Sequence, residues 1–463
     1  MFGREVYEAR RKALAGRLGK GLLLFPGNGE SPMNYADNAY SFRQDSTFLY
    51  YFGLSQPELA AMLDAETGLA TLFGDELTLD MIVWTGELPT IAARAEQAGV
   101  ADTRPLAALP DAVNSARATG REIHYLPPYR ADTTLLLSEL LGIAPREIAR
   151  RASVELVRAV VDQRAHKAPE EIAEIERAVA VSVQMHQAGM RLARPGVTER
   201  SIAAEVERIA NESGGRLAYP IIGTVNGQTL HNHSYPGTLA EGNLYLLDAG
   251  AETELGYAGD LTSTCPVAAR FSERQRTVYE ILLHAYDAAV GGLRPGVPYR
   301  DVHFIAARAI FEGMKGLGIM RGDTEEALAA GAHALVFPHG LGHMMGLDVH
   351  DMENLGEQYV GYAEGQVRST QFGLKSLRLA RPLEPGFVLT IEPGIYFIPQ
   401  LIDAWRAKGH LAEFIDYDEV DRWRDFSGVR SEENYLITES GARRLGPRKP
   451  QTIEEMEAVR ATG

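Results

Sequence analysis

The chain of 463 residues is 45% hydrophobic and 23% charged, the composition of a globular protein with about two or three domains. Its 46 lysines and arginines against 62 aspartates and glutamates give a formal charge of −16, which argues against nucleic acid or an anionic membrane as a partner. The single cysteine, Cys265, excludes an intrachain disulfide and favours a reducing compartment. The apolar run at residues 21–25 is too short for a signal peptide, and no run reaches the roughly 18 residues of a membrane span. We therefore expect a cytoplasmic protein.

Residues 1–165 alternate helical and strand-like runs, such as the strand-like "EIHYL" at 122–126 and the helix-like run at 145–167. The stretch Lys167-Ala168-Pro169 then reads as a hinge followed by a helix start, with proline and acidic residues in the first turn. These patterns predict a smaller α/β domain over residues 1–165 and a second domain over residues 166–463.

The second domain contains an internal repeat, which predicts a duplicated structure. "RPGVTERSI" at 194–202 recurs as "RPGVPYRDV" at 294–302, and "LAEGNLYLLDAG" at 239–250 recurs as "LEPGFVLTIEPG" at 383–394. In the second pair, an apolar strand-like run ends in Asp248 or Glu392. We expect a duplicated α+β unit, a mostly antiparallel sheet with helices on one face, in which these two acids approach each other.

Four carboxylates stand beside strand-like runs, where acids are rare: Asp248, Asp260, Glu392 and Glu432. A buried carboxylate is costly unless it is paired or binds a metal, and any one of the four could be satisfied by a local arginine or backbone N–H. Together they require cationic charge, which two divalent ions would supply. Oxygen ligands with an imidazole suit Mn²⁺, Co²⁺ or Zn²⁺. Two such ions can activate a shared water and polarise a carbonyl, which is the chemistry of amide hydrolysis.

The segment "HGLGHMMGLDVHD" at 339–351 carries three of the twelve histidines, His339, His343 and His350. Its three glycines disfavour a helix and suit a close approach to a ligand or metal. Taken one at a time, the histidines could equally be structural. Other catalytic patterns are absent from the sequence: it has no G-x-S-x-G, H-E-x-x-H or P-loop, and Cys265 before Pro266 reads as a packed thiol.

These motifs together resemble the pita-bread metallopeptidases, in the proline-specific branch of prolidase and aminopeptidase P. The resemblance covers residues 165–447 through "LLDAG", "AGDLT", "HGLGHMMGLDVHD", "TIEPGIYF" and "GVRSEEN". A weaker match, "YSFRQDSTFLYYFG" at 40–53, is similar to the first domain of that branch. The resemblance implies a pita-bread catalytic domain preceded by an aminopeptidase-P-type, creatinase-like domain, and small proline-containing peptides as substrates.

The resemblance also implies roles for individual residues. Two divalent ions, Mn²⁺ in first place, would be held by five side chains, with Asp260 and Glu432 shared between the ions: Asp248, Asp260, His343, Glu392 and Glu432. Glu392 would also carry a proton, and His350 would help to stabilise the oxyanion. His339 and His350 would bind substrate or transfer protons, and His231, in "QTLHNHSYPG", would be a further active-site histidine, with His233 a bystander. Arg430 would contact the metal-binding side chains rather than the ions and would help to orient them.

Arg378 distinguishes the two activities of the branch. It matches the arginine by which prolidases hold the free carboxylate of a dipeptide, and a guanidinium forks onto a carboxylate with two hydrogen bonds. The alternative is an exposed arginine in a basic run. We therefore expect an Xaa-Pro dipeptidase. Two alternatives remain: an Xaa-Pro aminopeptidase that acts on longer peptides, and a scaffold that binds ligands or performs other chemistry. We also expect a homodimer, by analogy with relatives.

Two features depart from the family pattern. The interval from Asp248 to Asp260 is twelve residues, one more than usual, and Ser431 replaces an apolar residue beside Glu432. Neither departure removes a predicted metal ligand.

Overall fold

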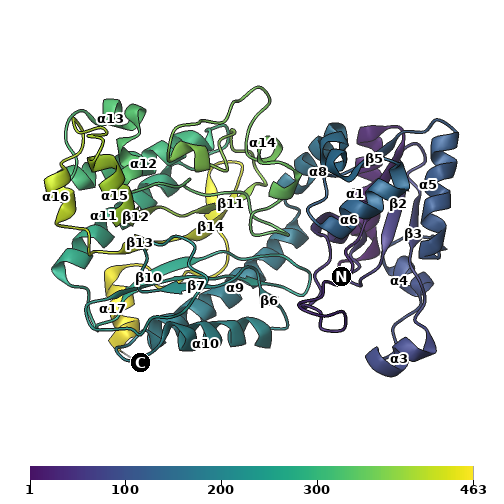
Figure 1. Cartoon of the computed structure of the whole chain (residues 1–463), viewed down its shortest axis with the longest axis horizontal. Helices are drawn as coiled ribbons and strands as arrows, with labels where there is room; N and C mark the ends of the chain where they lie inside the picture. The colour runs from purple at the N-terminus through teal and green to yellow at the C-terminus, as the bar shows by residue number, and fades with distance from the viewer. Residues whose placement is uncertain (462–463) are drawn as a thin grey trace. The chain divides into compact units, whose positions relative to one another are not determined.

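The computed structural model describes residues 1–461 and divides the chain into two compact units. The first unit consists of Met1–Arg164 together with Met352–Tyr359, and the second begins at Ala165 and resumes at Val360 (Figure 1). The short segment 352–359 therefore belongs to the first unit although the chain on either side of it belongs to the second. No helix among residues 1–461 is both long and apolar enough to cross a membrane.

The first unit is built on a mixed sheet with the strand order β4-β3-β2-β1-β5. Strand β2 pairs antiparallel with both β1 and β3, whereas β1–β5 and β3–β4 are parallel pairs. The strands are β1 (Leu22–Pro26), β2 (Ala60–Asp64), β3 (Ala70–Phe73), β4 (Asp102–Arg104) and β5 (Ile123–Tyr125). The α-helices are α1 (Arg4–Leu18), α2 (Ser46–Phe52), α3 (Leu79–Thr85), α4 (Ile91–Gln97), α5 (Leu109–Ala118), α6 (Ala131–Leu141), α7 (Pro145–Ile148) and α8 (Val154–Ala165).

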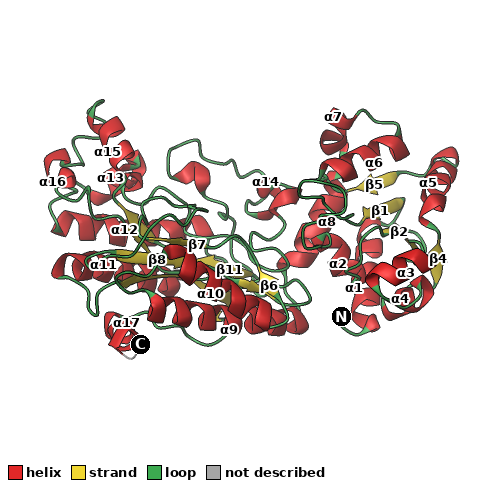
Figure 2. Ribbon diagram, turned by 60° about the horizontal axis from the view of Figure 1, so that its bottom comes forward, coloured by secondary structure: helices red, strands yellow, loops and turns green. Residues whose placement is uncertain are grey.

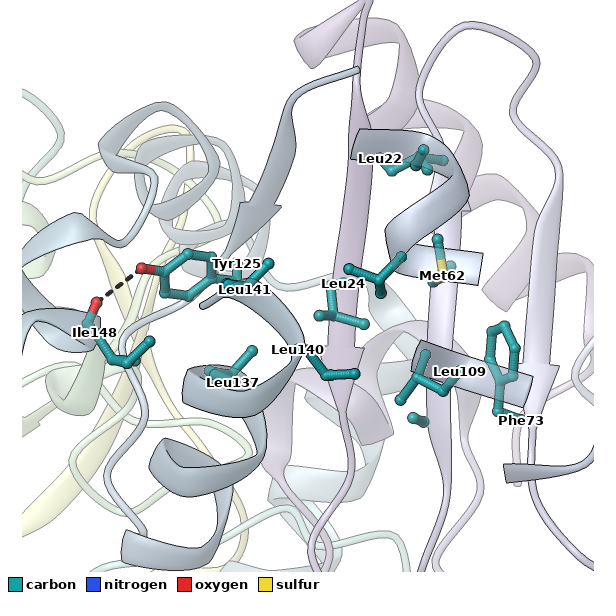
Figure 3. Packing of buried hydrophobic residues seen from close by; sticks show 13 residues of the cluster. Leu22, Leu24, Met62, Phe73, Leu109, Tyr125, Leu137, Leu140, Leu141 and Ile148 are labelled. Atoms are coloured by element: carbon teal, nitrogen blue, oxygen red, sulfur yellow. Dashed lines mark hydrogen bonds between the residues drawn. The ribbon is translucent and has the colours of Figure 1, made fainter. Parts of the chain in front are cut away.

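A hydrophobic core joins one face of this sheet to helices α5 and α6 (Figure 3). Leu24 of β1 and Leu137 of α6 are both buried in it. The hydroxyl of Tyr125 donates a hydrogen bond of 3.0 Å to the carbonyl oxygen of Ile148, so that the polar atom of this buried ring is satisfied (Figure 3). Helix α3 differs from the other α-helices of residues 1–461, because none of its residues is buried and its Trp84 is 84% exposed.

The helix-like run at 145–167 is interrupted in the structure. Helix α7 ends at Ile148, and α8 begins at Val154 after a short 3₁₀ turn. The interruption is stabilised by Ser153, whose hydroxyl accepts the amide of Leu156 at 3.2 Å and whose own amide donates to the carbonyl of Tyr125 at 3.0 Å. A serine in this position caps a helix and competes with its continuation, which periodicity alone does not reveal.

The strands of the second unit pair antiparallel in every case described within residues 165–461, as the sequence predicts. Strand β8 lies between β7 and β10, and β14 lies between β11 and β15, while β12–β13 and β6–β9 form two-stranded pairs. The strands are β6 (Arg216–Leu217), β7 (Ile222–Thr224), β8 (Leu244–Asp248), β9 (Ala251–Glu252), β10 (Thr262–Pro266), β11 (Val388–Ile391), β12 (Gly394–Tyr396), β13 (Gly428–Arg430), β14 (Glu433–Ile437) and β15 (Ala442–Arg444).

The helices repeat as the sequence does. Helices α9 and α10 pack together and contact strands of the first half, whereas α11 packs on α12 and contacts strands of the second half (Figure 2). The α-helices are α9 (Pro169–Leu192), α10 (Glu199–Glu212), α11 (Glu273–Gly292), α12 (Tyr299–Gly316), α13 (Thr324–Ala330), α15 (Pro399–Arg406), α16 (Tyr417–Asp421) and α17 (Ile453–Ala461). The short helix α14 (Glu357–Val360) lies mostly within segment 352–359 of the first unit. Both α10 and α12 begin inside the repeated "RPGV" segments, so the repeat corresponds to a duplicated α+β unit.

Candidate metal centre

The four predicted acids lie at or near the ends of neighbouring strands, with Asp260 two residues before β10. Asp248 is the last residue of β8, and its backbone pairs with Thr262 at the start of β10. Thr262 also forms an isolated bridge with Glu432, which directly precedes β14. Glu392 directly follows β11, the strand that pairs with β14. Because strand pairing brings these ends together, acids that are far apart in the sequence gather in one place.

The histidine-rich segment lies along β11 as an irregular extended chain. The amide of Thr390 donates to the carbonyl of His343 at 3.0 Å, and the amide of Glu392 donates to the carbonyl of Leu341 at 2.8 Å. Gly342 is required by this approach, because a Cβ there would lie 2.2 Å from the carbonyl oxygen of Thr390. The glycines therefore allow the chain to bring His343 against Glu392.

The imidazole of His343 faces two of the acids. Its Nε2 lies 3.3 Å from Oδ2 of Asp260 and 3.8 Å from Oε1 of Glu392, while its Nδ1 lies 2.9 Å from the carbonyl oxygen of Met344. The carbonyl can only accept, so Nδ1 carries the hydrogen, and the lone pair of neutral imidazole is left on Nε2, facing the carboxylates. Asp260, His343 and Glu432 each present a ligand atom within 4.8 Å of the others.

Asp248 and Asp260 share a partner. The hydroxyl of Tyr219 lies 2.7 Å from Oδ1 of Asp248 and 2.5 Å from Oδ1 of Asp260. The other carboxylate oxygen of Asp248 accepts a charge-assisted hydrogen bond of 2.6 Å from Nη2 of Arg430. Tyr219 thus holds both aspartates, and Arg430 fixes the orientation of Asp248.

These residues fit a site for cationic metal ions. Burial raises the pKa of Glu392 to about 7 and, with the neighbouring acids, raises the pKa of Glu432 well above its ordinary value. Within residues 1–461, Oε1 of Glu432 is buried without a hydrogen-bond partner. Four carboxylates and a lone-pair-bearing imidazole in this arrangement repel one another unless positive charge lies between them. The donor set of oxygens and one nitrogen suits a hard or borderline divalent ion.

The other two histidines of the segment lie beside this cluster. Nε2 of His339 lies 2.9 Å from the hydroxyl of Tyr396, which also accepts a hydrogen bond of 2.9 Å from Arg430. Burial, together with the charge of Arg430, lowers the pKa of His339 to about 3, so its ring is neutral. The ring of His350 lies against the ring of His343, with 4.1 Å between their centroids.

His231 and Arg378 approach the centre from other segments. His231 lies on an exposed loop, where partial desolvation and then the positive charge of Arg430 lower its pKa, with a smaller contribution from Arg378. The side chain of Arg378 is half-buried. His233 is exposed, and its ring centroid lies 6.3 Å from that of His231. Cys265 is buried in β10, and burial raises the pKa of its thiol to about 12, so it is a packed thiol as the sequence suggests.

Residues 173–439 match the model of metallopeptidase family M24, and residues 7–124 match that of the aminopeptidase P N-terminal domain. The chain belongs to metallopeptidase family M24. The Xaa-Pro dipeptidase of Homo sapiens is 31% identical over 98% of this chain and 93% of its own length. The Xaa-Pro aminopeptidase of Escherichia coli is 30% identical over 99% of this chain and 98% of its own length.

Solved structures of family members have the same architecture. The zinc-substituted E. coli aminopeptidase P in complex with product superimposes with a TM-score of 0.82 at 29% identity, covering 100% of this chain and 99% of that one. The predicted fold, a pita-bread unit of duplicated α+β structure after a smaller N-terminal domain, is confirmed.

Two tyrosines of this M24 site did not stand out in the sequence. Tyr396 lies within the quoted motif "TIEPGIYF", four residues after Glu392, so its position could have been read as part of the site. Tyr219 precedes Pro220 in an irregular segment with no motif around it. Only the tertiary fold brings its hydroxyl to the two aspartates.

Proposed function

We propose that the protein hydrolyses the Xaa-Pro bond of dipeptides. The observation that carries the proposal is the convergence of four carboxylates and His343 in an M24 chain, with Arg378 near enough for its charge to act on His231. Relatives named Xaa-Pro dipeptidase and Xaa-Pro aminopeptidase match almost the whole chain. These observations support an Xaa-Pro peptidase, and Arg378 favours the dipeptidase.

Five side chains would hold two divalent ions, in first place Mn²⁺, with Co²⁺ or Zn²⁺ also suited to the donors: Asp248, Asp260, His343, Glu392 and Glu432. Ions held there would lower the pKa of a water and polarise the scissile carbonyl. Tyr219 and Arg430 keep Asp248 in the orientation that its ligand role requires.

The remaining roles fall to side chains around the five. Glu392 accepts a proton from the attacking water and returns it to the leaving proline nitrogen. His350, beside His343, donates to the carbonyl oxygen as negative charge develops on it. His339 and His231 contact the bound peptide. Neutral His339 does so without adding positive charge beside Arg430.

The choice between dipeptidase and aminopeptidase depends on Arg378. A guanidinium at the carboxyl end of the bound substrate selects peptides that end in proline. In a longer peptide the proline carbonyl is part of an amide bond, so it cannot accept the two parallel hydrogen bonds that a carboxylate accepts. Comparing kcat/KM for Ala-Pro and Ala-Pro-Ala-Ala tests this. Preference for Ala-Pro is expected, and clear preference for the tetrapeptide would make the protein an aminopeptidase.

A scaffold without peptidase activity is the alternative of another class. It is disfavoured because all five predicted ligands are present and lie together. A purified protein that contains no metal, and that cleaves neither peptide after addition of Mn²⁺ or Co²⁺, would support the scaffold.

We further propose a homodimer acting in the cytoplasm, with residues 1–165 as the N-terminal domain and 166–463 as the catalytic domain. The apolar surface of α3, which includes Leu79 at 76% and Trp84 at 84% exposure, supports association, and the single buried cysteine is compatible with a reducing compartment. Light scattering of the wild type and Trp84→Ser is the test. A wild-type mass of one chain would exclude the dimer.

A further inference from the structure

A buried ion pair lies beside the catalytic segment but outside the five predicted ligands. Nζ of Lys167 lies 2.8 Å from Oδ2 of Asp351, and both side chains are 1% exposed. Removing two charges from water is costly, and such pairs are often no more stabilising than apolar residues of similar volume. Stabilisation of the fold therefore does not by itself explain why this buried pair is present.

The acidic partner closes the turn that carries His350. The amide of Asp351 donates to the carbonyl of Met344 at 3.0 Å, and Oδ1 of Asp351 lies 3.4 Å from the amide of Asp348. Asp351 follows His350 directly, so the geometry of this turn decides where the imidazole stands. The ring of His350 contacts that of His343 at a centroid distance of 4.1 Å.

The backbone of the turn is shaped around the ion pair. A Cβ on Gly346 would lie 2.6 Å from Oδ2 of Asp351 and 2.8 Å from Cε of Lys167. Glycine is therefore needed at 346 for the turn to close over both side chains. The segment and the pair fit each other as one packed unit.

The backbone of the basic partner is bonded to the second half of the repeat, and the helix that follows it is bonded to the first half. The amide of Lys167 donates to the carbonyl of Gly386, just before β11, at 2.9 Å. Two residues later α9 begins, and His186 of this helix lies with Nε2 3.0 Å from the carbonyl oxygen of Ala249, next to Asp248. Lys167 thus offers a rigid anchor to the more irregular segment 344–351.

The pair also stands where the chain passes between the two units. The chain enters the second unit between Arg164 and Ala165, and leaves it between Asp351 and Met352. Both partners of the ion pair are within three residues of such a passage.

We propose that Lys167 and Asp351 are positioning residues for catalysis, and that their ion pair holds His350 in the orientation in which it acts on substrate. The inference rests on the proposed function of His350. It extends the site to a lysine that lies 172 residues before His339 (339 − 167), outside every motif of the M24 centre.

The test is a double-mutant cycle in the metal-loaded protein. Lys167→Met is expected to lower kcat by about 10- to 100-fold with a smaller change in KM, because a misplaced group costs rate rather than binding. In the His350→Ala background, Lys167→Met should have no further effect. An equal loss in both backgrounds would overturn the proposal, since a general structural defect acts whether or not His350 is present.

A second variant separates positioning from folding. Lys167→Met/Asp351→Leu replaces the pair by apolar side chains and should unfold at or above the wild-type temperature, with unchanged metal content, yet remain as slow as Lys167→Met. Full activity in this variant would show the pair to be structural only. As the matched control, Arg121→Met removes the partly buried ion pairs of Arg121 with Asp64 and Glu66 in the first unit and should leave kcat unchanged.

A spectroscopic readout distinguishes failure of this inference from failure of the proposed function. In zinc-loaded protein with ¹⁵N-labelled histidine, the His350 signal is identified by its absence in His350→Ala. We expect one sharp signal in the wild type and a shifted or divided one in Lys167→Met/Asp351→Leu, even if no Xaa-Pro peptide is cleaved. An unchanged signal would contradict the positioning role whatever the activity.

Discussion

Nε2 of His343 lies 3.3 Å from Oδ2 of Asp260, which joins the second half of the repeat to the first at the centre of the site. Nδ1 of the same ring is held by the carbonyl oxygen of Met344, so the imidazole reaches the carboxylate with its lone pair. A lone pair that faces carboxylate oxygens repels them, and a divalent cation bound by both groups removes this repulsion.

Replacing His343 by alanine should remove bound metal and activity together. We expect kcat/KM for Ala-Pro to fall by at least about 100-fold. Mutation of residues that only hydrogen-bond to a metal ligand already lowers metal affinity or activity by up to about 100-fold. Elemental analysis and rate are measured on the same sample. His233→Ala, an exposed histidine, is the control and should change neither quantity. Normal metal content in His343→Ala would contradict its assignment as a ligand.

Replacing Arg378 by methionine should affect the two peptides differently. Loss of a charged, forked hydrogen bond corresponds to about 1.5–3 kcal/mol, so KM for Ala-Pro should rise by roughly 10- to 100-fold. The weaker cleavage of Ala-Pro-Ala-Ala should change little, because its proline carries no free carboxylate. Equal changes for both peptides would mean that Arg378 does not read the carboxyl terminus.

Replacing Tyr396 by phenylalanine removes one hydroxyl that serves both Arg430 and His339. Because Arg430 keeps its bonds to Asp248 and Thr262, metal content should remain near that of the wild type. We expect kcat/KM to fall by about tenfold through the loosened His339. Steady-state kinetics with elemental analysis checks this, and an unchanged rate would exclude a role for the Tyr396 hydroxyl.

Stability should decrease in mild acid because of buried neutral histidines. Burial lowers the pKa of His333 to about 4 from 6.5 and that of His303 further below its ordinary value. Between about pH 6.5 and pH 4 these two histidines bind protons in the unfolded chain but stay neutral in the folded protein. The free energy of unfolding therefore falls by about 1.4 kcal/mol per pH unit for each such ring.

His333→Phe should reduce this dependence. The ring nitrogens of His333 are buried without hydrogen-bond partners in residues 1–461, so phenylalanine should not destabilise the protein at pH 7. Thermal melting at pH 7 and pH 5 is measured for both proteins. The variant should lose less stability on acidification than the wild type, and parallel losses would show that His333 does not titrate as described.

The sequence was sufficient for the architecture of the second unit because its determinants are local. An apolar run that ends in Asp248 or Glu392 specifies a buried strand with an acid at its end, and the "RPGV" segments mark the start of α10 and α12. Strand pairing then follows from burial of the apolar faces, which is why residues 144 apart (392 − 248) could be assigned to one site.

What the sequence could not provide were contacts made by isolated residues. Tyr219 and Lys167 belong to no motif, and their partners are 29 and 184 residues away. The sequence around Tyr219 looks like that around an exposed tyrosine, and the sequence around Lys167 looks like that around a lysine in a hinge. Similarly, segment 352–359 follows the histidine motif without a change in composition, yet it belongs to the first unit. Long-range packing decides such contacts, and periodicity carries no information on them.

The most direct measurement is a Mn²⁺ titration of chelator-treated protein, followed by the rate of Ala-Pro hydrolysis. If the five side chains hold a pair of ions that activates water, the metal-free protein is inactive and the rate rises to a plateau at two Mn²⁺ per chain. Hydrolysis by the fully metal-free protein, or a rate that never appears at saturating Mn²⁺, Co²⁺ or Zn²⁺, would contradict the account.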